Sequence, residues 1–111
     1  MPYTVSAAGN ILYCWLALPT LAPASVPANS TVEQAFTIGG LQPGDNVSCY
    51  CQSAPMTTGL GIINCRVSGA NTLQLGFSNS TAAILTPTAG QYYLYISRPE
   101  SYANLPTSAV G

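Results

Sequence analysis

The residues of this chain that could carry out chemistry are three carboxylates, four cysteines and two arginines, because the sequence contains no histidine and no lysine. Without histidine, the chain lacks the usual general base and the commonest metal ligand. The carboxylates Glu33, Asp45 and Glu100 fall on an expected strand, turn and tail, and nothing in their spacing brings two together as an acid–base pair. No phosphate-binding glycine loop or nucleophile elbow is present. The sequence therefore predicts a protein that is not an enzyme and needs no cofactor or metal.

The cysteines do not form a metal-binding pattern. Cys49 and Cys51 are two residues apart on an expected strand, and neither a C-x-x-C pair nor a histidine accompanies them. We expect Cys49, Cys51 and Cys65 to be free thiols that pack as small hydrophobic side chains. In a secreted chain, pairing with Cys14 or Cys65 would remain an alternative.

Charge is scarce, at 5% of residues with a net charge of −1, while 48% of residues are hydrophobic. Two arginines cannot form the basic face that nucleic acids require. The longest apolar run, residues 11–18, is too short to span a membrane. A surface with so little charge is expected to be covered in part by protein partners, with arginines as anchors for a partner's carboxylates. The candidate partner contacts are Tyr3, Tyr13, Trp15, Arg66, Arg98 and Tyr102.

The chain must position these residues on strands. Residues 31–38 alternate between apolar and polar side chains, Pro43-Gly44 is typical of a type II turn, and residues 47–51 alternate again, which together predict a β-hairpin. In residues 60–68 the alternation predicts that Gly61, Ile63, Cys65 and Val67 point inward.

Three further segments have strand character, and glycine, proline and asparagine turns separate them. These segments are residues 72–77, the short apolar run 82–85, and residues 91–98. Residues 11–18 fit a buried strand or a short buried helix, and their aromatic and β-branched residues favour the strand. Tyr92 lies where a tyrosine corner would bond to nearby backbone, although it could equally be an ordinary tyrosine at the start of a strand. The pattern predicts an all-β protein, an antiparallel β-sandwich or jelly-roll-like single domain.

The expected domain organisation has three parts. Residues 1–30 form an N-terminal segment with an arm in which prolines recur at positions 19, 23 and 27, a spacing that forbids a helix. Residues 31–98 form the sandwich, and residues 99–111 form a C-terminal tail. The triplets at Asn29, Asn46 and Asn79 match a glycosylation signal, but they arise easily by chance in a chain so rich in Ser, Thr and Asn.

Residues 32–99 carry a series of motifs: G-L-x-P-G-D in residues 40–45, G-L-G-I in residues 59–62, R-V-S-x-x-N in residues 66–71, F-x-N-x-T-A-A in residues 77–83 and P-x-x-G-x-Y in residues 87–92. This pattern resembles the small capsid-stapling decoration proteins of tailed bacteriophages, most of all those of the epsilon-15 group of short-tailed phages. The motifs consist of turn and core residues and cover roughly two-thirds of the chain, by the count of residues 32–99.

The resemblance implies a jelly-roll-like module on the outer surface of the virion. Such proteins bind the assembled icosahedral head, bridge neighbouring major capsid subunits, and have no catalytic residues. It also implies pairing with a second copy across a two-fold axis, and synthesis in a reducing bacterial cytoplasm, which agrees with free thiols. That residues 1–30 act as an arm on the capsid is our own inference.

Two other functions remain open from the sequence. A secreted Ig-like or lectin-like sandwich that recognises a sugar or a host protein would need formed disulfides and an exposed aromatic patch, for which Tyr93, Tyr95 and Tyr102 are candidates. A tail or spike component of the same virion is the other alternative, because the sequence does not separate it from a head protein.

Overall fold

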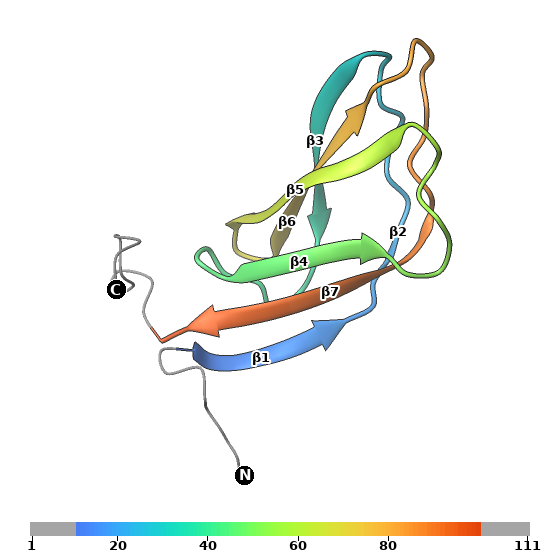
Figure 1. Cartoon of the computed structure of the whole chain (residues 1–111). Helices are drawn as coiled ribbons and strands as arrows, with labels where there is room; N and C mark the ends of the chain where they lie inside the picture. Colours follow the sequence, from blue (N-terminus) through green and yellow to red (C-terminus); the bar gives the residue numbers. More distant parts are fainter. Residues whose placement is uncertain (1–10, 101–111) are drawn as a thin grey trace, which may run out of the picture.

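Strand β7 (Gly90–Pro99) is the centre of a four-stranded antiparallel sheet in the computed structural model, which describes residues 11–100. β4 (Asn46–Cys51) pairs with one side of β7, and β1 (Ile11–Ala17) and β2 (Thr20–Leu21) pair with the other side (Figure 1). The choice of strand over helix for residues 11–18 is therefore confirmed, but the strand is not buried on both faces, because Leu12 and Leu16 are each 56% exposed.

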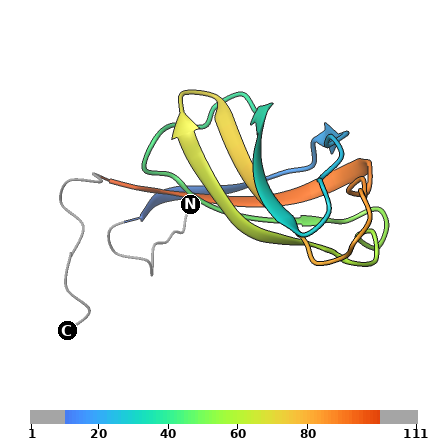
Figure 2. The same cartoon turned by 90° about the horizontal axis from the view of Figure 1, so that it is seen from above.

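The second sheet has three antiparallel strands in the order β3 (Ser30–Thr37), β6 (Thr72–Asn79) and β5 (Leu60–Gly69). The two sheets lie face to face, and their strands cross (Figures 1 and 2). The described chain is all-β and sandwich-like, as the sequence predicts. No helix in residues 11–100 is long and apolar enough to cross a membrane.

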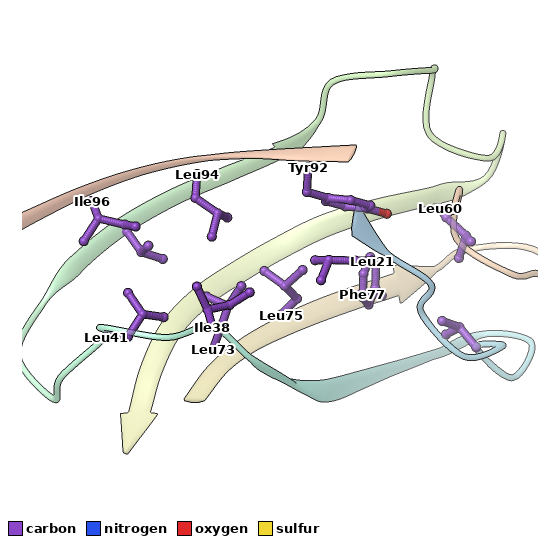
Figure 3. Close-up of a cluster of buried hydrophobic side chains, with 12 residues drawn as sticks. Leu21, Ile38, Leu41, Leu60, Leu73, Leu75, Phe77, Tyr92, Leu94 and Ile96 are labelled. Atoms are coloured by element: carbon purple, nitrogen blue, oxygen red, sulfur yellow. The ribbon is translucent and has the colours of Figure 1, made fainter. Parts of the chain in front are cut away.

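The core forms where the alternating faces of the two sheets meet. Leu73, Leu75 and Phe77 of β6 lie opposite Tyr92, Leu94 and Ile96 of β7, and all six are completely buried (Figure 3). Because side chains alternate along a strand, the three residues of each set share one face. Of the two readings of Tyr92, the structure shows the tyrosine corner, because the Tyr92 hydroxyl donates to the Thr88 carbonyl at 2.7 Å.

The predicted hairpin of residues 31–51 is wrong, although its turn is correct. The Asp45 amide donates to the Gln42 carbonyl at 3.1 Å and Gly44 has a φ of 96°, as a type II turn requires. However, β3 pairs with β6, and β4 pairs with β7 in the other sheet. The connection passes from one sheet to the other at the surface, where Gly40 and Gln42 are exposed, and it is held there by the Leu41 side chain, which packs into the core and is 1% exposed.

The inward face predicted for the first half of β5 is also wrong. A β-bulge interrupts the pairing with β6 between Ile62 and Asn64, so that Ile63 is an extra residue and is 57% exposed. As a result, Ile62 rather than Gly61 and Ile63 packs against the core. After the bulge the alternation recovers, and Cys65 and Val67 point inward as predicted.

The sandwich includes residues well before residue 31, because the segment predicted as an arm contributes two strands and part of the core. Leu21 and Val26 belong to the core, and Val26 forms a two-way backbone bridge with Leu85, which lies in the run predicted as a short strand. The side-chain amide of Gln34 accepts from the Ala24 amide and donates to the Ala24 carbonyl, each at 2.8 Å. A proline-spaced segment can do this because an extended chain needs only a few well-placed apolar residues and backbone bonds to dock.

A candidate docking face on the four-stranded sheet

The carboxylates and cysteines do not assemble into a reactive site in the described part of the chain. No three metal-binding side chains gather anywhere in residues 11–100. Glu33 and Asp45 lie in different parts of the fold, and each is paired with an arginine instead of with another acid.

Arg98 and Asp45 form a largely buried ion pair at one end of the four-stranded sheet. The Arg98 Nε and Nη2 atoms donate to Asp45 Oδ1 and Oδ2, each at 2.8 Å, and Nη2 also donates to the Gly40 carbonyl at 2.6 Å. The guanidinium lies 5.0 Å from the centre of the Trp15 ring, close enough for a cation–π contact. The hydrogen bonds from Arg98 lower the pKa of Asp45, which also accepts from the Gln42 amide in its own turn.

Arg66 and Glu33 form a second, exposed pair across the outer face of the three-stranded sheet. The Arg66 Nε and Nη2 atoms donate to Glu33 at 2.7 Å and 2.8 Å, and the hydrogen bonds lower the pKa of the carboxyl. Both arginines are candidate anchors for a partner's carboxylate in the sequence analysis. In the structure each pairs with a carboxylate of its own chain, and a contact with a partner stays a prediction.

The four cysteines are free, and three of them occupy the inner side of the sandwich as expected. Burial raises the pKa of Cys49 to about 12 and also raises the pKa of Cys65. The Cys65 thiol donates to the Val47 carbonyl at 3.1 Å, which links the neighbouring edges of β4 and β5. Cys14 differs because it is exposed.

The outer face of the four-stranded sheet carries exposed apolar and aromatic side chains beside the polar Asn46 and Ser48 of β4. Leu16 of β1 lies directly opposite Tyr95 of β7, and the two residues are 56% and 43% exposed. Tyr50 of β4, which is 55% exposed, stacks on Tyr93 with 5.3 Å between ring centres. The Cys14 thiol beside the Tyr95 hydroxyl raises the pKa of Tyr95. We call Cys14, Leu16, Tyr50, Tyr93 and Tyr95 the apolar face.

Sequence reasoning placed the candidate contacts elsewhere. Trp15 is half-buried against the core, on the side of β1 opposite to Leu16, and Tyr13 belongs to β1. Tyr3 and Tyr102 lie outside the described residues. The sequence did contain one signal for the apolar face. Both alternating sets of residues 11–18 are apolar, although an edge strand needs only one apolar face to join a sandwich.

The comparisons with known proteins provide no relative from which a function could be transferred. No protein-family model, curated protein or solved structure matches the chain. The apolar face is therefore the feature of the described residues on which a functional proposal can be built.

Proposed function

We propose that the chain is a structural virion protein that binds the outside of a phage capsid and staples neighbouring major capsid subunits. The observation that carries the proposal is the apolar face, in which leucine and tyrosine side chains are exposed on a sheet that has no charged residue on that face. Exposed apolar patches of this kind usually mark protein–protein contact sites. Tyrosine is also enriched in the residues that dominate binding energy at interfaces.

The partner in this proposal comes from the resemblance to capsid-stapling proteins, and one further feature agrees with it. The four cysteines are free, as a reducing bacterial cytoplasm would leave them. A protein that binds only the assembled shell stabilises it by mass action, because dissociation of the shell must first release the bound copies.

The test is co-sedimentation of the purified chain with empty phage heads assembled without it. Wild type should bind saturably and raise the resistance of the heads to heat. The double variant Leu16→Thr/Tyr95→Thr, which replaces a cross-strand pair of the apolar face with good strand formers, should bind at least about tenfold more weakly, a loss of about 1.4 kcal/mol.

The matched control replaces a cross-strand pair on the outer face of the other sheet, Ala35→Thr/Gln74→Thr. It should bind as wild type does. Absence of binding by wild type would overturn the proposal, and equal weakening by both variants would show that the apolar face is not the contact.

A second candidate function is a recognition module for a sugar or a host protein, and the stacked Tyr50 and Tyr93 beside Tyr95 favour it. Exposed aromatic side chains can stack on the apolar face of a sugar ring. A screen of immobilised glycans tests this function directly. A thiol count under denaturing conditions separates it from the capsid role, because four free thiols favour the phage protein and bridged cysteines favour secretion.

A further inference from the structure

Strand β1 is an edge of the four-stranded sheet. One side of β1 pairs with β7 over residues 11–17, and within residues 11–100 no strand pairs with its other side (Figure 1). An edge strand presents a row of backbone N–H and C=O groups that can pair with another chain.

The other long edges of the sandwich carry features that discourage such pairing. Glu33 places a charge on β3, and β5 carries Arg66 and two irregularities in its pairing. The edge of β4 lies beside β5, where the Cys65 thiol contacts the Val47 carbonyl. In contrast, β1 contains no charged residue and no proline, and the one irregularity in its pairing with β7 lies at its start, between Ile11 and Tyr13, so that residues 13–17 pair regularly.

The sequence of β1, ILYCWLA, is nearly symmetric about Cys14. Leu12 and Leu16 lie two residues on either side of it, and the aromatic residues Tyr13 and Trp15 are its direct neighbours. In an antiparallel pair of identical strands related by a two-fold axis, residue i lies opposite residue j and j opposite i. An axis through Cys14 therefore places leucine opposite leucine and aromatic opposite aromatic, and it brings no like charges together.

We propose that β1 pairs antiparallel with β1 of a second copy of this chain, with Cys14 on the two-fold axis. The two four-stranded sheets would then continue into one another, and their apolar faces would lie side by side as one larger surface. The inference deepens the proposed function, because it names the strand through which two copies would pair on a shell. Its test uses the free protein without heads, so that its failure would leave the result for shell binding intact.

A residue on the two-fold axis lies opposite the same residue of the second copy, and the first experiment uses this property. Cys14 is exposed, so Cys14→Lys and Cys14→Glu should both fold, which circular dichroism would check. Analytical ultracentrifugation over a concentration series should show a dimer for wild type. Each variant alone should associate at least about tenfold more weakly, because like charges then lie directly opposite each other. An equal mixture of the two variants should regain the dimer.

The mixture makes the register testable. If the axis lay elsewhere, residue 14 would face a different residue, and mixing would not restore what each charge had weakened. A wild-type chain that stays monomeric at all concentrations would overturn the proposal, as would charged variants that dimerise as well as wild type.

A covalent readout is available in wild type. Residues directly opposite in an antiparallel pair have Cα atoms about 4.5 or 5.5 Å apart, and both spacings fall in the range of about 4.4–6.8 Å that a disulfide accepts. With oxidised glutathione as the oxidant, two Cys14 thiols should lose two protons and two electrons and form a disulfide-linked dimer, while the glutathione disulfide is reduced to two thiols. Cys14→Ser should abolish this dimer, and its persistence in that variant would contradict the assignment of the axis.

Discussion

The outer face of the four-stranded sheet presents Leu16, Tyr50 and Tyr95 to solvent, whereas the outer face of the three-stranded sheet presents Thr37, the Arg66–Glu33 pair and one large apolar side chain, Ile63 at the bulge. Both inner faces are equally apolar, so the difference does not arise from the needs of the core. A sandwich is stable with polar residues on both outer faces. Under the proposed function, the outer face of the four-stranded sheet is the contact surface, and the outer face of the three-stranded sheet faces solvent.

The two ion pairs also differ, in how far their side chains are exposed to solvent. The Arg98–Asp45 pair has side chains that are only 15% and 1% exposed, and it ties the end of β7 to the turn that precedes β4. The Arg66–Glu33 pair has side chains that are 52% and 35% exposed. Of the two pairs, only the first is desolvated enough for the loss of its carboxylate to leave a largely buried guanidinium without a counter-charge.

The largest effect that we predict follows from this difference. Asp45→Asn keeps an oxygen for the Gln42 amide but removes the charge opposite Arg98, and it should lower the free energy of unfolding by about 3–5 kcal/mol. Glu33→Gln, the matched change in the exposed pair, should cost no more than about 1 kcal/mol. Urea unfolding of the three proteins measures both values.

The stability at acidic pH provides a control for the predicted effect of Asp45→Asn. Because Arg98 lowers the pKa of Asp45 below its ordinary value of 3.8, this part of the stability is present above pH 3.8 and is lost as the pH falls through the lowered pKa. Asp45→Asn should therefore show a weaker loss of stability in acid than wild type. Equal costs for the two substitutions at neutral pH would contradict the contrast between the pairs.

The second prediction concerns alkaline pH and the inner side of the sandwich. The pKa of Cys49 is raised by burial from 9.0 to about 12, so the unfolded chain loses this proton first. Stability should be complete below pH 9 and should fall between pH 9 and about 12. For a fully buried group, each unit of pKa shift corresponds to about 1.4 kcal/mol of stability. Because Cys49 is only half-buried, we expect a smaller total fall, of about 1–2 kcal/mol.

Cys49→Ala should flatten this alkaline decline in denaturant-unfolding series recorded across the pH range. The comparison rests on the slope against pH, because removal of a packed thiol can also lower the stability at every pH. Cys14→Ala, at the exposed cysteine, serves as the control and should leave the slope unchanged. A decline of the same steepness in all three proteins would place its origin in other groups.

The sequence predicts much of this fold because strand periodicity is local. The alternating residues of β6 and β7 identify the core, and Pro43-Gly44 identifies its turn, since both signals depend on neighbours in the chain. Strand partners are different. Nothing near residues 30–37 indicates that their partner lies at residues 72–79, and only the burial of Leu41 explains why the chain changes sheets.

The apolar face was predictable from the sequence only in part, because the exposure of a side chain also depends on the whole fold. Tyr95 was recognised as a candidate aromatic contact for a binding module, but Leu16 was not, because an exposed leucine and a core leucine look the same in a sequence. The intramolecular ion pairs of the arginines were not predictable, because Glu33 and Asp45 are distant from them in sequence and meet them only through the fold. Asn79, which lies in a triplet of the glycosylation type, is 2% exposed and donates to the carbonyls of Val26 and Ala83 instead.

The smallest predicted effect compares two tyrosines three residues apart on β7. Tyr92 is completely buried, and its hydroxyl donates to the Thr88 carbonyl, so Tyr92→Phe should cost about 1 kcal/mol, the usual net value of such a bond. Tyr95 is on the apolar face, and Tyr95→Phe should change the free energy of unfolding by less than about 0.5 kcal/mol. Urea unfolding measures both variants under the same conditions. If Tyr95→Phe proved the more costly of the two, the outer tyrosines would be serving the fold, and their exposure would no longer argue for a partner.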